Sequence, residues 1–174
     1  MKITLKKADK SEKEIIQNLA CFYTYDMSRH CGFLPGWETP SDGNYTCFDL
    51  SRYWEEPDRY PYLIEVDKEL AGFALLHKIG STVDIDWTIG EFFIVAKFQG
   101  KGIGCKIAHQ LFNRFNGKWE VMQIPENSAA IAFWKKVIHE YTEGNFEISE
   151  KTVQDPKPHP MIVMTFSSSP DSGT

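Results

Sequence analysis

The spacing of hydrophobic residues along the chain changes several times, and each change predicts a different element. Apolar residues recur at helical spacing from Ile15 to Phe22, behind a Ser11-Glu-Lys-Glu14 stretch that has the form of a capping box. A second helix is expected from residue 103 to about 115, where apolar residues recur every four positions, and a third from Asn127. Residues 50–56 have the pattern of one or two helical turns.

Extended apolar runs bounded by turn residues predict strands between these helices. They cover residues 3–7, 62–66, 70–78, 83–95, 119–123, 146–153 and 161–166. Residues 27–49 have little regular period, and no linker divides the chain, so we expect a single α/β (α+β) domain over residues 1–166. Residues 167–174 form a polar tail that we expect to be mobile.

The clearest chemical signal lies where the strand ending at Val95 leads into the helix at residue 103. Gln99 and the glycines at 100, 102 and 104 fill this link. A helix N-terminus presents unpaired N–H groups and a partial positive charge, and glycines let a phosphate approach the backbone. A Walker loop and a dinucleotide fingerprint both require glycine where the chain has Cys105, so neither fits. The residues therefore predict a pyrophosphate cradle of another kind.

Two motifs carry a resemblance to a known family. Gln99-x-x-Gly102-x-Gly104 looks like the acetyl-CoA motif of the GNAT (Gcn5-related) N-acetyltransferases. The segment from Asn127 through Ala130 to Phe133 resembles the second signature of that family, Asn-x-x-Ala-x-x-Phe-Tyr. The resemblance is specific over residues 85–138, whereas residues 1–84 share only the order of elements. Short runs such as Glu-Phe-Phe are similar to a bacterial group of predicted acetyltransferases.

The resemblance implies the GNAT fold, a mixed and mostly antiparallel sheet of about six to seven strands flanked by helices. Two neighbouring strands splay apart in that fold, and here they should be the strand ending at Val95 and the strand over 119–123. The resemblance also implies that acetyl-CoA is the cofactor, with its pantetheine arm in the splay. The expected cofactor-binding residues are Phe92, Phe93, Ile94, Lys97, Gln99, Gly100, Lys101, Gly102, Ile103, Gly104, Asn127, Ala130, Phe133 and Trp134.

The implied chemistry is direct attack of a primary amine on the thioester, which makes the chain an acyltransferase. The amine must lose a proton, and Glu91 is the first candidate for the base because two phenylalanines follow it and would desolvate it. Asp86 on the same strand is the second candidate. Trp134 occupies the position of the family tyrosine that serves as an acid, and an indole cannot deliver a proton at neutral pH. Tyr141 is a possible substitute, or the thiolate leaves without a side-chain acid.

The acceptor wall in the resembled fold corresponds to the aromatic segment that precedes the first hairpin. Tyr25, Asp26, Trp37 and Trp54 are the expected substrate-binding residues, because aromatic faces with carboxylates suit an ammonium group. We expect a small-molecule amine, aminoglycoside-like or polyamine-like, as the acceptor. Two alternatives stay open, namely a protein lysine or N-terminus as the acceptor, and a non-catalytic acyl-CoA sensor.

Composition limits the partners, the cellular location and the metal sites that we expect. The net charge of −5 argues against nucleic acid as a partner, because such binding depends on phosphate neutralisation. The sequence has no apolar run of membrane-spanning length and no apolar signal core, so we expect a cytoplasmic protein that does not contact a membrane. The four cysteines lack metal-site spacing, and no metal is expected. A homodimer is left open.

Overall fold

A computed structural model of the 174-residue chain describes residues 1–168. The strands are β1 (Ile3–Lys7), β2 (Arg59–Val66), β3 (Glu69–His77), β4 (Trp87–Ile94), β5 (Gly117–Gln123), β6 (Glu147–Val153) and β7 (His159–Ser168). The helices are α1 (Lys13–Cys31), α2 (Arg52–Glu55), α3 (Ile103–Arg114) and α4 (Ser128–Thr142), with short 3-10 turns at Lys10–Glu12 and Ala96–Phe98.

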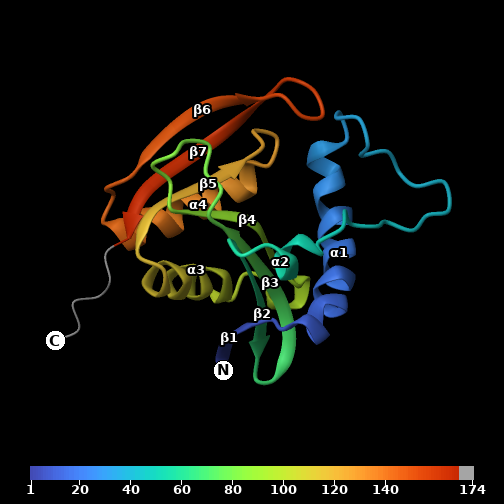
Figure 1. Ribbon diagram of the computed structural model, residues 1–174, viewed down its shortest axis with the longest axis horizontal. Coiled ribbons are helices and arrows are strands. Elements are labelled where there is room, and N and C mark those ends of the chain that lie inside the picture. The colour runs from blue at the N-terminus through green and yellow to red at the C-terminus, as the bar shows by residue number, and fades with distance from the viewer. Residues whose placement is uncertain (169–174) are drawn as a thin grey trace.

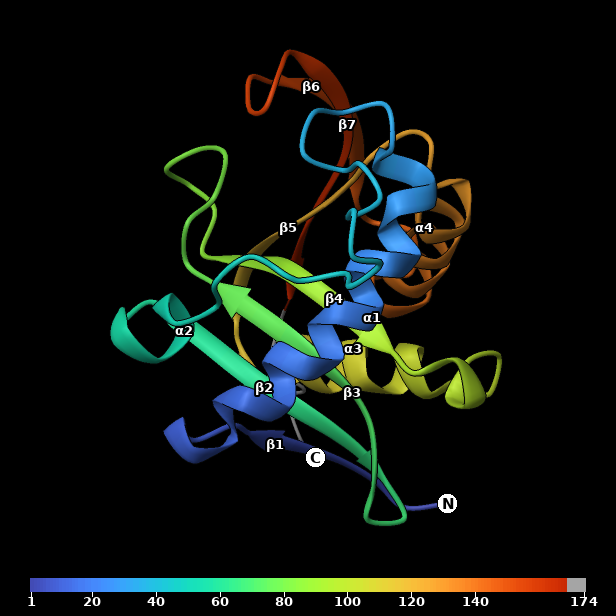
Figure 2. The ribbon, with the colours of Figure 1, turned by 90° about the vertical axis from the view of Figure 1, so that its right-hand side faces the viewer.

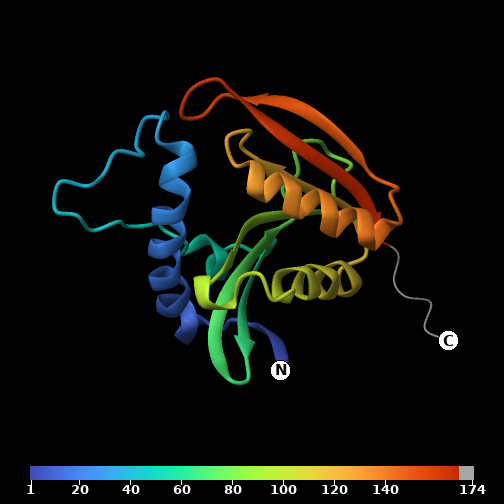
Figure 3. The same ribbon diagram turned by 180° about the vertical axis from the view of Figure 1, so that it is seen from behind.

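The seven strands form one sheet in the order β1-β2-β3-β4-β5-β7-β6. All neighbours are antiparallel except β4 and β5, so the sheet is mixed and mostly antiparallel, as the resemblance implied. Helices α3 and α4 lie on one face of the sheet and α1 on the other (Figures 1 and 3). Figure 2 shows α1 crossing in front of β2, β3 and β4.

Each face of the sheet has its own core, because successive side chains of a strand point to opposite faces. Ile103, Ile107 and Leu111 of α3 pack with Trp119 of β5 and other apolar residues on the α3/α4 face. On the other face, Ile16 of α1 lies among a smaller set that includes residues of β2, β3 and α2. Phe92 and Phe93, adjacent on β4, belong to opposite faces.

The sheet splits between its two parallel strands. β4 and β5 pair only from Trp87 opposite Trp119 to Ile89 opposite Val121, although both strands continue beyond these residues. A bulge leaves Gly90 of β4 without an opposite residue on β3 at the point where the split begins. The splayed pair is the one predicted from the sequence.

Several predicted boundaries were wrong. Asp9 and Glu12 form the capping box instead of residues 11–14, and α1 then runs to Cys31 through residues predicted to be irregular. The strand predicted over 83–95 begins only at Trp87, because the preceding loop is held by bonds from Ser81 to the buried carboxylate of Glu120. Residues 167 and 168 of the predicted tail belong to β7, and residues 169–174 lie outside the described residues.

Candidate acyl-transfer site

The glycine-rich link forms an open cradle at the start of α3. Gly100 and Gly102 have φ of 71° and 74°, a left-handed backbone conformation that residues other than glycine rarely adopt. Gly102 is the N-cap of α3 and offers no side chain to the first turn, so the helix N–H groups there have no side-chain cap. A cavity of about 350 Å³ adjoins this turn and is lined by the glycines, Gln99 and residues of α4. This geometry suits a phosphate.

Helix α4 forms the opposite wall of this cradle. Asn127 caps the helix by accepting a hydrogen bond from Ala130 N at 3.1 Å. Phe133 stacks on Phe92 of β4, with ring centroids 6.1 Å apart. A Cβ at Gly104 would lie 3.1 Å from the Phe133 ring, so glycine at this position permits the close approach of α3 to α4.

The expected basic residues of the cradle lie at its exposed edge. Lys97 forms an ion pair with Glu69, and its ammonium also lies 5.0 Å from the centre of the Phe98 ring. Lys101 is exposed and faces the same ring at 5.9 Å. Gln99 donates to the carbonyl of Ile94 at 2.7 Å, which ties the link back to the end of β4.

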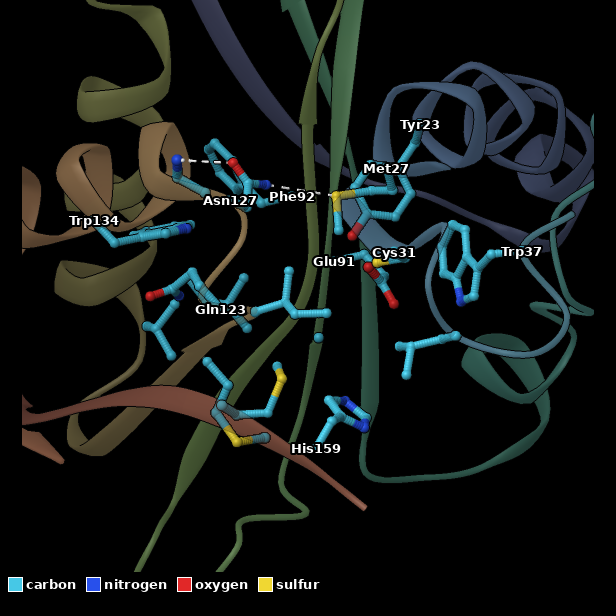
Figure 4. A pocket seen from close by; sticks show the side chains of 18 of the residues that line it. Tyr23, Met27, Cys31, Trp37, Glu91, Phe92, Gln123, Asn127, Trp134 and His159 are labelled. Atoms are coloured by element: carbon cyan, nitrogen blue, oxygen red, sulfur yellow. Dashed lines mark hydrogen bonds between the residues drawn. The ribbon is translucent and has the colours of Figure 1, made fainter. Parts of the chain in front are cut away.

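A second cavity, of about 340 Å³, occupies the split in the sheet (Figure 4). It shares Phe92, Ala130 and Trp134 with the glycine cradle. Its walls come from both faces of the sheet: Glu91, Tyr23 and Trp37 line it from the α1 face, whereas Gln123 and Trp134 line it from the α4 face (Figure 4). The central cavity therefore connects the cofactor motif with the predicted acceptor wall.

Glu91 is the one predicted base that lies in the central cavity. Desolvation by the surrounding protein raises the pKa of its carboxyl from 4.5 to about 7, and a hydrogen bond from Tyr23 partly opposes this shift. Burial and the nearby Glu91 also raise the pKa of the Tyr23 hydroxyl, so Tyr23 stays a hydrogen-bond donor. A carboxyl with a pKa near neutrality can accept a proton and release it again.

The two other catalytic candidates lie elsewhere. Asp86 is exposed and accepts a hydrogen bond from Lys118 N at 2.8 Å, at the end of β4 away from the split. The Tyr141 hydroxyl donates to Asn113 at 2.8 Å, and its ring packs against Phe112. Neither residue lines the central cavity, so the geometry favours Glu91.

Of the four predicted acceptor residues, Trp37 lines the central cavity. Asp26 borders a neighbouring hollow and forms an ion pair with Arg29. Tyr25 is exposed and packs edge-on against Tyr45. The Trp54 indole donates to the carbonyls of Ala8 and Asp9, which ties α2 to the link that follows β1.

Several residues that line the cavity were not among the predicted site residues, including Tyr23, Gln123 and His159. Tyr23 is one helical turn before Met27, which also lines the cavity, but the helical pattern was followed only to Phe22. His159 is buried, and its Nδ1 lies 2.8 Å from the Lys157 carbonyl, so Nδ1 carries a proton and donates to that carbonyl. Gln123 carried a readable signal, because it takes the polar place on the buried face of β5 after Trp119 and Val121.

Among residues 1–168, no three histidine, cysteine, aspartate or glutamate side chains gather as a metal site would require. None of the helices within those residues combines the length and the apolar character needed to cross a membrane. Cys21, Cys31, Cys47 and Cys105 are free cysteines. Burial raises the pKa of the Cys31 and Cys47 thiols to about 11.

The chain is similar to proteins of one family. Residues 20–139 match the family model described as the acetyltransferase (GNAT) family. No curated protein matches the sequence significantly.

Solved structures with the same fold cover nearly all of the chain. An acetyltransferase from Thermus thermophilus superposes with a TM-score of 0.66 at 15% identity, over 96% of this chain and 97% of that one. Aminoglycoside acetyltransferase AAC(6')-Ib, solved with coenzyme A, gives 0.63 at 16% identity over 95% of both chains. The ribosomal-protein-S18-alanine N-acetyltransferase from Escherichia coli gives 0.57 at 11% identity over 99% of both chains. At these identities the similarity establishes the fold.

Proposed function

Because the chain belongs to the acetyltransferase (GNAT) family, we propose that it transfers an acetyl group from acetyl-CoA to a primary amine, with Glu91 as the general base. The observation that carries this proposal is the central cavity, which joins the glycine cradle to Glu91 through the split in the sheet. Acetyl-CoA would supply an activated thioester; the residues of the chain bind it, orient it and move the proton.

Along the two cavities, the residues would contact the parts of acetyl-CoA in turn, from the pyrophosphate to the pantetheine arm. The turn from Gly100 to Gly104 would hold the pyrophosphate through backbone N–H groups, with Lys97 and Lys101 adding positive charge at the edge. The unpaired segments of β4 and β5 leave main-chain groups for the pantetheine arm. Phe92, Ala130, Phe133 and Trp134 would pack against the arm where the two cavities meet.

The proton transfer follows from the position of Glu91 on the α1 face. An amine that enters between Tyr23 and Trp37 would reach the split beside the Glu91 carboxylate, which accepts its proton directly or through a water. The leaving thiolate has a pKa of roughly 8.5, so it needs no strong acid. Trp134, in the position of the family tyrosine, can offer an N–H hydrogen bond but no proton.

The acceptor that we propose is a small-molecule amine. The acceptor side of the cavity has aromatic and sulfur-containing walls, from Tyr23, Met27 and Trp37, and they would enclose a compound of modest size. AAC(6')-Ib, which has the same fold, has been solved with ribostamycin and with kanamycin, and this supports a small acceptor here.

The first experiment measures the melting temperature of the purified protein with acetyl-CoA, ATP and NAD. A ligand at a hundred times its dissociation constant stabilises a fold by roughly 2.7 kcal/mol, so acetyl-CoA alone should raise the melting temperature. A panel of small amines and of peptides with free N-termini or lysines then follows, with free thiol as the readout. No shift with millimolar acetyl-CoA would refute the assignment of acetyl-CoA as the cofactor. Binding of acetyl-CoA without turnover on any amine would favour a sensor.

A further inference from the structure

The side chain of Gln123 is buried in the central cavity without a hydrogen bond. Gln123 is 5% exposed, and neither its Nε2 nor its Oε1 has a partner among the residues that the structure describes. Almost all buried polar groups in folded proteins are paired, so an amide with two unpaired atoms requires an explanation. Burying such a group also costs stability.

The surroundings of Gln123 do not provide the missing partner. It follows Trp119 and Val121 on the face of β5 that packs against α4, where both of those residues are apolar. Figure 4 places Gln123 and Trp134 on the α4 side of the cavity, and Glu91 with Tyr23 on the other side. Neither Glu91 nor Tyr23 therefore pairs with it, and no other described residue of the cavity forms a hydrogen bond with its side chain.

The chemistry of the amide defines what would complement it. The Nε2 group is a donor and Oε1 is an acceptor, on one planar group. A thioester carbonyl can only accept, and an ammonium group can only donate. The pantetheine arm contains two secondary amides, and between them they offer both N–H donors and carbonyl acceptors.

We propose that Gln123 binds a pantetheine amide of acetyl-CoA through its side chain and so sets the depth at which the acetyl group stops beside Glu91. This inference rests on the proposed function and adds to it a cofactor contact that neither family motif contains. The location agrees, because Gln123 lies two residues beyond the last β4–β5 pair, where the strands have separated. The unpaired amide costs the free protein stability and is satisfied only when the arm is bound.

The test compares the wild type with Gln123→Leu and Gln123→Met, which keep the approximate volume and remove the polar atoms. Melting of the free proteins and calorimetric binding of two ligands are measured, coenzyme A and 3'-phospho-ADP, which lacks the pantetheine arm. We expect the free variants to melt at or above the wild-type temperature. We expect coenzyme A to bind about tenfold more weakly, the scale of a net hydrogen-bond contribution, and 3'-phospho-ADP to bind unchanged. Gln110→Met, on the exposed surface of α3, is the control and should change nothing.

Three results would overturn the inference. Unchanged binding of coenzyme A to both variants would mean that the arm does not contact Gln123. Equal weakening for the two ligands would indicate a general distortion of the site. Turnover lost with coenzyme A affinity intact would place Gln123 against the acceptor. If the wild type binds neither ligand, the proposed function itself fails, which the wild-type titration alone reveals.

Discussion

The two sides of the split sheet differ in how far apart their residues lie in the sequence. The cofactor side consists of a glycine turn, the helix that follows it and the first turns of α4, all within residues 99–134. The acceptor side draws Tyr23 from α1, Trp37 from a loop, Glu91 from β4 and His159 from β7. The first side offers backbone groups that are local in sequence, and the second offers side chains that only tertiary packing brings together.

Removing the Glu91 carboxylate should show the largest difference between the two sides, because it should affect catalysis and not cofactor binding. We expect Glu91→Gln to lower kcat by about 10²–10⁴, the usual contribution of a positioned base, while coenzyme A binds as before. Steady-state kinetics and calorimetry test both halves. Glu150→Gln, at an exposed position on β6, is the matched control. A fully active Glu91→Gln variant would remove Glu91 from the mechanism.

A substitution in the glycine turn should do the opposite. It should weaken cofactor binding and leave the acceptor side unchanged. Gly102→Ala places a side chain at φ 74°, where the left-handed backbone costs roughly 1–2 kcal/mol of strain. Because the turn must change shape to relieve this strain, we expect coenzyme A to bind about tenfold more weakly. Gly36→Ala is the control, since Gly36 has φ 87° and open space around its added Cβ but lies outside the cradle. Equal affinity in the two variants would argue against a backbone cradle.

The raised pKa of Glu91 predicts how stability depends on pH. The folded carboxyl titrates at about 7 and the unfolded one near 4.5, so the native state binds the proton more tightly. The wild type should therefore lose up to about 3 kcal/mol relative to Glu91→Gln as pH rises from 4.5 to 8. Denaturant unfolding of both proteins across this range gives the difference. A constant difference between them would mean that the carboxyl is not desolvated.

The smallest expected effect concerns Tyr23, which tunes the base. Its hydrogen bond favours the charged carboxylate, so Tyr23→Phe should raise the pKa of Glu91 further. The rising limb of the profile of kcat/KM against pH, near 7 in the wild type, should move to higher pH with coenzyme A affinity unchanged. Phe22→Leu, on the exposed side of α1, should leave the profile in place. A limb that stays at the wild-type pH in Tyr23→Phe would show that Tyr23 does not act on the base.

Structure and sequence agreed best where an element depends on its own residues. The start of α3 at the glycine turn and the start of α4 next to Asn127 were anticipated, since glycine conformation and side-chain capping act over a few positions. The start of β4 was placed too early because bonds from Ser81 to Glu120, distant in sequence, hold the preceding loop. Gln123 shows the same limit within the site: its residue type was visible, but its lack of a partner was not.

The sequence by itself determined the alternation of helices and strands, the glycine cradle and an acidic residue within β4. These follow from periodicity, backbone freedom and residue type, which are local properties. Only the tertiary structure decided that Glu91 faces Tyr23, that Asp86 and Tyr141 lie apart from the cavity, and that Gln123 is buried at the split without a partner. Burial and distance decide those points, and both depend on how segments remote in sequence pack against one another.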